Sequence, residues 1–371
     1  MRLRNAAALA AASVVGAGTA ALAAGRYGSG FALRPSLAGP APEGLITARD
    51  ITRDRVTLTR TDASARPGVW GLTGIGVHAT VGRVTGRTER TVTRELLRVG
   101  KGTLTEGGFV RITPQAYAGD PGSAFGLDFT EREVPGELGP LPAWYLPGLR
   151  PTWVICVHGL GAGRERALNL LPALNRFRFP QLVVSYRNDP GAPASPDGIG
   201  HLGDTEWHDL DAAMRHAVDS GAHRIILYGW STGATMALHA FRHSPVRDKV
   251  AGLVLDSPVL DWRFTVGAAA KSRGLPGALV PLAVRAAEGR TGPVAAHRGE
   301  PAATGELTVP TLVVHGPDDT LAPWDDSRAL VDRQPGAVSL HTVPGAPHAA
   351  MWNVNPATYE ETLRRFLTPL M

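Results

Sequence analysis

Two different patterns of apolar and polar positions divide most of the chain. Between residues 45 and 135, short segments such as Arg55–Thr59 and Phe109–Thr113 alternate apolar and polar positions, with glycine-containing turns between them. Alternation with a period of two is typical of strands that bury one face. The pattern predicts a small β-rich domain over 45–135, in which only Glu89–Val99 suggests a helix.

From residue 136 to 371, short and wholly apolar segments alternate with helical stretches. We expect strands at Thr152–Val157, Gln181–Tyr186, Arg224–Tyr228, Val250–Leu255, Thr311–Val314 and Val338–Val343. We expect helices at Arg164–Asn175, Asp204–Ser220, Thr232–His243, Pro323–Gln334 and Pro356–Leu367. Such alternation predicts an α/β fold with a mostly parallel sheet covered on both faces. Residues 261–306 interrupt it and are rich in Ala, Gly and Pro, so we expect an inserted helical lid there.

Residues 1–44 follow neither pattern. Arg2 and Arg4 precede an uncharged run, rich in Ala and Gly, that extends to Gly25, and a Pro- and Gly-containing linker follows. The run is just long enough to span a bilayer, although Ala and Gly are only weakly apolar. We expect a membrane anchor over residues 5–25 with the rest of the chain outside the cytoplasm. Cleavage of the run as a signal after Ala23 would give a secreted protein instead.

Composition narrows the function classes. Hydrophobic residues make up 43% of the 371 residues and charged residues 19%, which is typical of a packed globular chain. The formal charge is +5, but the basic residues are scattered, so we expect no nucleic-acid partner. The single cysteine, Cys156, lies in a predicted strand and is expected to be a buried thiol. The sequence contains no zinc-type cluster and no phosphate-binding loop, and we expect no cofactor.

The pentapeptide Gly229–Gly233 has the form Gly-x-Ser-x-Gly, with Ser231 at its centre. A predicted strand ends just before it and a predicted helix begins just after the serine. A sharp strand-to-helix turn of this kind exposes the serine hydroxyl above the sheet, next to a helix N-terminus. The pattern therefore predicts Ser231 as a nucleophile rather than as an ordinary helix cap.

Two loops after later strands supply the other groups that a nucleophilic serine needs. His348 follows the last predicted strand and is the expected general base. Asp319 lies on the loop after the preceding strand and is the expected acid that orients the histidine. Asp318 could serve in its place, and Asp256, after an earlier strand, is a further alternative. The order Ser, Asp, His along the chain is that of an α/β-hydrolase triad.

An oxyanion hole is expected from two backbone N–H groups. Leu160 lies in a Gly-rich loop that follows the strand Thr152–Val157, and Thr232 directly follows the serine. Their N–H groups would face the same point above the sheet. An amide next to Leu160 is an equal candidate for the first donor. His158, which opens this loop, is expected to be structural.

Residues 140–371 resemble the α/β-hydrolase superfamily. The segments that carry the closer resemblance, to membrane-associated or exported α/β hydrolases of actinobacteria, are Val157–Leu160, Ser185–Asp189, Gly203–Trp207 and Tyr228–Gly233. The resemblance implies a catalytic triad of Ser231, Asp319 and His348 and leaves the substrate open.

Three functions are compatible with these residues. The first is hydrolysis of a carboxylic ester, on a small molecule or a lipid, through an acyl-enzyme. The second is a serine peptidase of the same fold, of a small aminopeptidase-like kind. The third is a non-catalytic surface protein that keeps the fold as a binding module. We expect the first; the presence of all three groups of the triad argues against the third, and the second stays an alternative.

Overall fold

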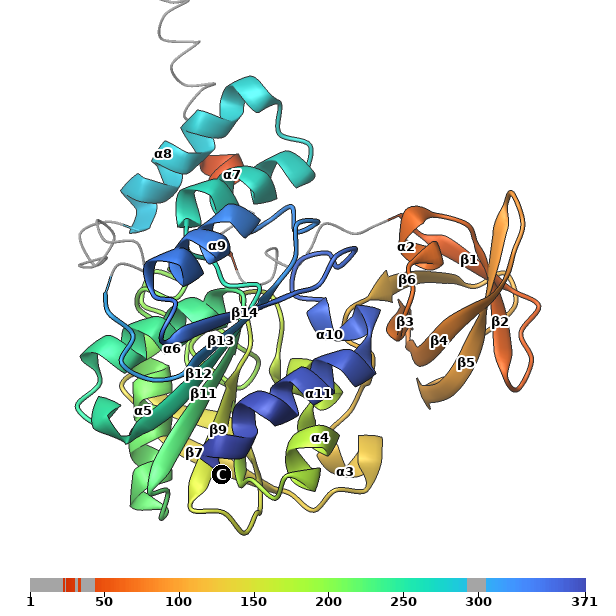
Figure 1. The fold of residues 1–371 in the computed structure, drawn as a ribbon. Helices are drawn as coiled ribbons and strands as arrows, with labels where there is room; N and C mark the ends of the chain where they lie inside the picture. Colours follow the sequence, from red (N-terminus) through yellow and green to blue (C-terminus); the bar gives the residue numbers. More distant parts are fainter. Residues whose placement is uncertain (1–22, 24, 31–32, 35–43, 292–304) are drawn as a thin grey trace, which may run out of the picture.

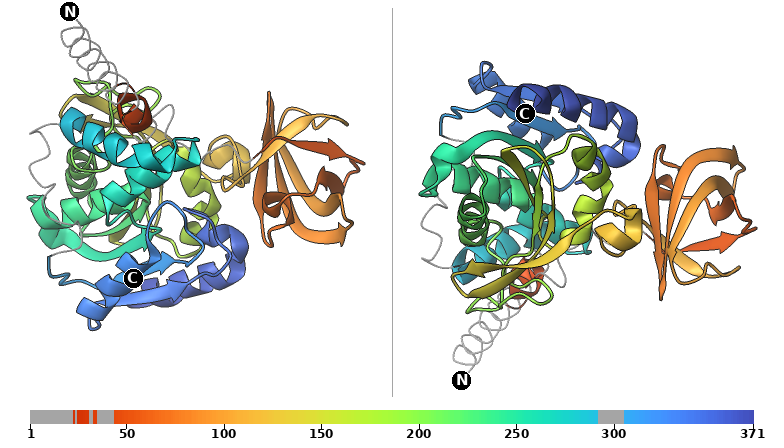
Figure 2. Two further views of the ribbon diagram at one scale, coloured as in Figure 1. Left: turned by 90° about the horizontal axis from the view of Figure 1, so that it is seen from above. Right: turned by 90° about the horizontal axis from the view of Figure 1, so that it is seen from below.

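A computed structural model of the chain describes residues 23, 25–30, 33–34, 44–291 and 305–371. These residues form a closed β-barrel and, after it in the chain, a separate eight-stranded sheet. Figure 1 shows the barrel beside the large sheet, and both views in Figure 2 agree with this placement. The α/β-hydrolase architecture with a β-rich N-terminal extension, which the sequence predicts, is therefore confirmed.

The barrel uses residues 46–113 and closes in the order β1-β2-β5-β4-β3-β6. Its strands are β1 (Ile46–Arg49), β2 (Arg55–Thr59), β3 (Trp70–Gly74), β4 (Val77–Arg87), β5 (Thr91–Lys101) and β6 (Phe109–Thr113). A one-turn helix, α2 (Asp62–Ala65), connects β2 to β3. Closure pairs each strand on both sides and leaves no exposed sheet edge.

The prediction of a helix at Glu89–Val99 is wrong, because this segment forms most of strand β5. Val92, Arg94 and Leu96 are the buried positions of the strand, so a charged residue occupies one position of the inward face. Arg94 is fully buried and donates hydrogen bonds only to backbone carbonyl groups, including those of Gly82 and Gly68. The charge at an inward position conceals the strand period in the sequence.

The large sheet has the strand order β14-β13-β12-β11-β9-β10-β8-β7. Its strands are β7 (Thr130–Gly136), β8 (Gly139–Leu146), β9 (Thr152–Val157), β10 (Gln181–Val184), β11 (Arg224–Trp230), β12 (Val250–Asp256), β13 (Thr311–His315) and β14 (Val338–Thr342). The six strands from β9 to β14 pair in parallel, and β7 and β8 are antiparallel. The domain boundary expected at residue 135 therefore falls within this sheet, since β7 pairs with β8 and not with the barrel.

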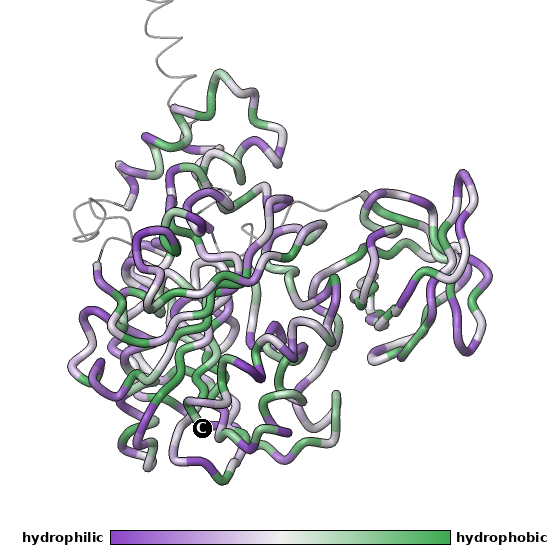
Figure 3. The backbone as a smooth tube through the Cα atoms, in the orientation of Figure 1, coloured by the Kyte–Doolittle hydropathy of each residue, from purple (hydrophilic) through white to green (hydrophobic). Residues whose placement is uncertain are grey.

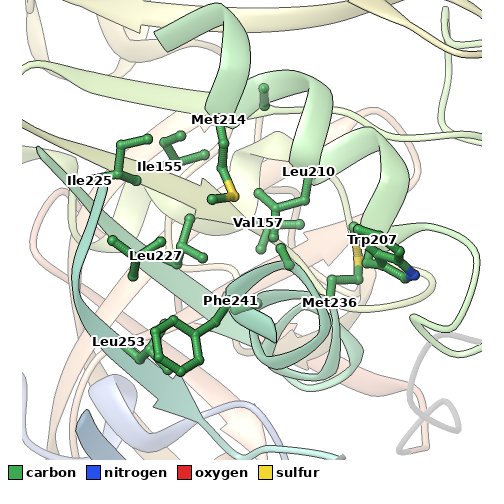
Figure 4. Close-up of a cluster of buried hydrophobic side chains, with 14 of the residues drawn as sticks. Ile155, Val157, Trp207, Leu210, Met214, Ile225, Leu227, Met236, Phe241 and Leu253 are labelled. Atoms are coloured by element: carbon green, nitrogen blue, oxygen red, sulfur yellow. The ribbon is translucent and has the colours of Figure 1, made fainter. Parts of the chain in front are cut away.

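Helices cover both faces of the sheet, as predicted. On one face lie α5 (Trp207–Asp219), α6 (Thr232–His243) and α9 (Trp324–Arg333), and on the other α4 (Leu171–Arg176) and α11 (Pro356–Leu367). Figure 4 shows the packing of α5 and α6 on the strands, and Figure 3 shows the apolar residues concentrated there. The predicted buried thiol, Cys156, lies in the opposite core, where burial raises its pKa to about 12.

Two helices occupy the segment expected to form a lid. They are α7 (Trp262–Ser272) and α8 (Val280–Thr291), and residues 292–304 of that segment lie outside the described residues. The described N-terminal residues pack on α8: a Cβ placed on Gly28 would lie 2.8 Å from the Cβ of Ala283. Arg290 Nη1 donates to Ser29 Oγ at 3.1 Å. Part of the N-terminal segment 1–44, which the sequence assigns to an anchor or signal and a linker, therefore belongs to the packed structure.

The prediction of an N-terminal membrane anchor or signal segment requires correction. Within the described ranges, no helix is sufficiently long and apolar to cross a membrane. Residues 1–22, which hold most of the expected anchor, lie outside those ranges. Its last residue, Gly25, is buried against α8, where an added Cβ would lie 2.8 Å from the carbonyl oxygen of Leu282. Ala and Gly are only weakly apolar, so the length of a run that is rich in them is a poor criterion for predicting a membrane span.

Candidate active site

Ser231 occupies the sharp turn between β11 and α6, with φ 54° and ψ −120°. A positive φ is strained for a residue with a side chain, and such strain is concentrated at functional sites. The turn is possible only because glycines flank the serine. A Cβ on Gly229 would lie 2.4 Å from the carbonyl oxygen of Gly233, and one on Gly233 would lie 2.4 Å from that of Val157.

The structure brings together the three residues that the sequence predicts as a triad. Ser231 Oγ lies 2.7 Å from His348 Nε2, and His348 Nδ1 lies 2.7 Å from Asp319 Oδ2. The Asp319 side chain is fully buried and that of His348 is 13% exposed. The geometry can pass a proton from the serine hydroxyl to the imidazole while the carboxylate holds the ring.

The carboxylate of Asp319 accepts four hydrogen bonds. Its Oδ2 accepts hydrogen bonds from two imidazoles, that of His348 and that of His315, whose Nε2 lies 3.0 Å away. Its Oδ1 accepts from the N–H groups of Leu321 and Ala322 at 2.8 and 2.9 Å. Burial alone would raise the pKa of Asp319, but His348 and these hydrogen bonds outweigh it and hold the pKa well below its usual range. His315 was not predicted from the sequence, although its position four residues before the acid could have suggested it.

The two alternative acids, Asp318 and Asp256, make hydrogen bonds to groups other than His348. Asp318 accepts the backbone N–H of Gly345 at 2.6 Å on the outside of the loop. Asp256 is fully buried and accepts from Ser257 Oγ at 2.9 Å and Tyr359 OH at 2.7 Å. The geometry therefore favours the acid that the spacing predicts.

The expected oxyanion hole is only half formed. The N–H of Leu160 donates to Thr232 Oγ1 at 2.8 Å, so it is already engaged in this state. The N–H of Thr232 lies at the first position of α6, where an α-helix supplies no intrahelical acceptor. Leu160 could serve an oxyanion only after the Thr232 hydroxyl releases its N–H.

His158 holds the turn after β9. Its Nε2 lies 2.8 Å from Asp189 Oδ2 and its Nδ1 lies 2.9 Å from the carbonyl oxygen of Gly159. Both partners are acceptors, which favours a ring that carries a proton on each nitrogen. Burial alone would lower the pKa of His158, but the Asp189 carboxylate and these hydrogen bonds raise it. The structural role expected for this residue agrees with these contacts.

A cavity of about 170 Å³ opens beside Ser231 and His348. Three separate parts of the chain form its walls. The loops and the ends of elements above the large sheet contribute Gly159, Leu160, Gly161, Ala162, Arg166, Leu202, Trp230, Thr232, Leu321 and Ala349. The lid helix α7 contributes Thr265 and Ala269, and the exit from the barrel contributes Thr113, Pro114 and Gln115. The barrel therefore forms one wall of the cavity, which the sequence did not predict.

The barrel is fixed to a short helix, α10 (Met351–Val354), that follows the base. The fully buried Asn353 donates from Nδ2 to the carbonyl oxygens of Val69 and Pro114, each at 2.8 Å. Its own carbonyl oxygen accepts the N–H of Val69 at 2.8 Å. These three bonds set the position of the barrel wall relative to the histidine loop.

Comparisons with known proteins give the same fold. A family model described as an alpha/beta hydrolase fold matches residues 152–274, and a model of a domain of unknown function matches residues 47–113 in the barrel. Protein YfhR of Escherichia coli K12, described as uncharacterized, is 23% identical over 238 residues, which cover 62% of this chain and 76% of YfhR.

Crystal structures of the Pyrococcus furiosus esterase Pf2001 are similar as well. One of them has a TM-score of 0.53 and 20% identity, covering 68% of this chain and 96% of the esterase. A second crystal form has a TM-score of 0.54 and 21% identity, covering 68% and 94%. These matches show the same fold, and the resemblance to actinobacterial membrane-associated hydrolases is not shown. The chain has the α/β-hydrolase fold.

Proposed function

We propose that this protein is a serine hydrolase that cleaves carboxylic esters, with Ser231 as nucleophile, His348 as general base and Asp319 as the orienting acid. The observation that carries the proposal is the unbroken chain of two 2.7 Å hydrogen bonds from Ser231 Oγ through His348 to a buried carboxylate. The strained backbone of the serine supports it, because strained conformations are concentrated at functional sites.

In the first half of the reaction, Ser231 Oγ attacks the ester carbonyl carbon while His348 Nε2 accepts the hydroxyl proton. The tetrahedral oxyanion receives the N–H of Thr232 and, after release from the threonine hydroxyl, that of Leu160. The C–O bond to the alcohol then breaks, and His348 returns the proton to the departing alkoxide. Water, deprotonated by the same imidazole, attacks the acyl-serine and releases the acid and Ser231.

Esters are the favoured substrates for two reasons. The cavity of about 170 Å³ suits a small acyl group, and among the described residues that line it Arg166 alone carries a formal charge. A protein of similar fold, Pf2001, is named an esterase. The peptidase hypothesis predicts instead that aminoacyl anilides are cleaved at rates comparable with esters.

Labelling with a fluorophosphonate probe tests the nucleophile. We expect the wild-type protein to be labelled at a single serine, and Ser231→Ala to lose the label while it keeps its circular dichroism spectrum. Ser339→Ala is the matched control, because Ser339 is an exposed serine on β14. Labelling of Ser231→Ala at the wild-type level would refute the assignment.

A substrate panel tests the reaction class. Methyl and p-nitrophenyl esters with short and long acyl chains are compared with alanine and leucine p-nitroanilides. We expect serine-dependent hydrolysis of short esters and, at most, slow cleavage of the anilides. Faster turnover of the anilides would replace the esterase proposal with the peptidase. A labelled protein that turns over neither class would show that the substrate is not an ester or amide of these kinds.

A further inference from the structure

Arg166 is a cation that the proposed mechanism does not use. It lies in a 3₁₀ helix, Arg164–Asn169, that follows the Leu160 loop, and its side chain lines the same cavity as Ser231 and His348. Only 6% of the residue is exposed. A buried guanidinium is costly unless acceptors surround it, since Arg cannot lose its charge in ordinary conditions.

The described part of the protein does not supply those acceptors. The Nε of Arg166 is buried and has no hydrogen-bond partner. The neighbouring Arg164, by contrast, donates to Glu131 at 2.8 Å from the same 3₁₀ helix. A native protein rarely leaves a buried donor without a partner, and a bound ligand is one of the few reasons for it.

Asp256 is the carboxyl group that interacts electrostatically with Arg166, but it does not neutralise it. The Asp256 oxygens are bonded to Ser257 and Tyr359 instead. Burial lowers the pKa of Arg166 despite the attraction of Asp256, and burial raises the pKa of Asp256 despite the attraction of Arg166. In a compensated ion pair both shifts would have the opposite sign. Because Asp256 makes its side-chain hydrogen bonds to Ser257 and Tyr359, and Arg166 Nε has no partner in the described part of the chain, the guanidinium can accept a further anion.

We propose that Arg166 binds a carboxylate of the substrate, so that the preferred esters carry a free carboxylate a short distance from the ester carbonyl. This inference rests on the proposed function, because it places the carboxylate in the cavity beside Ser231. Arg166 is the only residue with a formal charge among those that line the cavity in the described part of the chain. A planar guanidinium fork matches a carboxylate with two parallel hydrogen bonds.

A carboxylate fits this place better than a phosphate. The single positive charge of Arg166 balances one negative charge, and a phosphate monoester carries nearly two at neutral pH. The second negative charge would also be repelled by the buried Asp256, which interacts electrostatically with Arg166. The cavity of about 170 Å³ also limits the ligand to a few heavy atoms beyond the ester group.

Monomethyl succinate and methyl butyrate form the test pair, since they differ only in that a carboxylate replaces a methyl group. We expect the wild-type kcat/KM to favour monomethyl succinate by about 10–100-fold, the range that a hydrogen bond to a charged group gives. Arg166→Met should reduce this ratio to about one, and Arg166→Lys, which keeps the charge, should retain part of it. Arg164→Met, a loss of charge in the same 3₁₀ helix, should keep the wild-type ratio.

A binding measurement separates this inference from the proposed chemistry. On a Ser231→Ala background, isothermal titration calorimetry compares N-phenylsuccinamate with N-phenylbutyramide, the amide counterparts of the two esters. We expect tighter binding of the anionic amide by at least about tenfold, and loss of the difference when Arg166→Met is added. Absence of any anionic preference in a protein that hydrolyses methyl butyrate overturns the Arg166 inference alone. A preference in binding without hydrolysis of either ester supports the anion site and overturns the esterase proposal.

Discussion

The backbone N–H of Ala349 donates a 3.0 Å hydrogen bond to Oγ of Ser257. Both residues have a left-handed backbone, with φ of 53° for Ala349 and 51° for Ser257. Ser257 Oγ donates in turn to the buried Asp256 at 2.9 Å. This hydrogen bond links the residue after the proposed base to the residue after β12. We infer that the link helps to orient the imidazole of His348 toward Ser231.

We therefore expect Ser257→Ala to impair turnover, although the Ser257 side chain does not line the cavity. The loss leaves the Ala349 N–H and one Asp256 oxygen without a partner, and we expect kcat to fall by about tenfold with a smaller change in KM. Steady-state kinetics, with urea unfolding to follow stability, measure both effects. Ser339→Ala serves again as the control. An unchanged kcat in a folded Ser257→Ala would show that the tie does not position the histidine.

Asp319→Asn should preserve the fold and reduce kcat by up to about 10⁴-fold, because the imidazole loses its anionic partner and its preferred tautomer. Two matched controls are available. Asp318→Asn changes an exposed neighbour, and Asp256→Asn changes the other buried candidate. If either control loses activity to the same extent while Asp319→Asn does not, the acid has been assigned to the wrong residue.

Elements with a complete periodic signal could be predicted to the residue. Helix α6 begins at Thr232 and ends at His243, as expected, because the nucleophile turn precedes it and Pro245 follows its end closely. Strand β9 also matches, since all six of its residues are buried and apolar or nearly so. The prediction of the triad followed from such boundaries, because Ser231 directly follows one strand, and Asp319 and His348 lie on the loops that follow two others.

Other parts could not be predicted, for physical reasons that differ. Strand β7 buries only Val134 among its seven residues, so no alternation marks it. The Arg94 side chain interrupts the inward face of β5. Asn353 and Val69 are hydrogen-bonded although they lie 284 positions apart, and a contact between residues so distant leaves no local pattern in the sequence. Arg166 likewise has no spacing that relates it to Ser231; only the fold places both on one cavity.

Asn353→Ala should destabilise the protein by about 1–3 kcal/mol, because the buried carbonyl oxygen of Val69 loses a donor that water cannot replace. Urea unfolding followed by tryptophan fluorescence measures this change. Asn175→Ala, at a half-buried amide near the end of α4, is the control and should change the free energy of unfolding by less than about 0.5 kcal/mol. Equal stability of Asn353→Ala and wild type would show that the barrel does not depend on these bonds.

The imidazolium of His158 should make stability depend on pH. Its pKa is raised in the folded state, so its contribution is fully present below the unfolded value, about 6.5, and is lost as pH rises through the folded pKa. Unfolding free energies measured between about pH 6 and pH 9 should thus fall more steeply in wild type than in His158→Gln. Asp189→Asn, which removes the carboxylate partner, should flatten the profile in the same way. Parallel profiles in all three proteins would contradict the doubly protonated ring.

The packing of the N-terminal residues on α8 has a consequence for biosynthesis. Ser29 and its partner Arg290 are separated by 261 positions, so the ribosome releases the first long before it makes the second. At the usual rates of elongation the interval is on the order of 10–50 seconds. The barrel and most of the large sheet can form during that time, before the hydrogen-bond partner of Ser29 on α8 has been made. The first described residues of the chain to be synthesised can consequently complete their contacts with α8 only after most of the chain has been made.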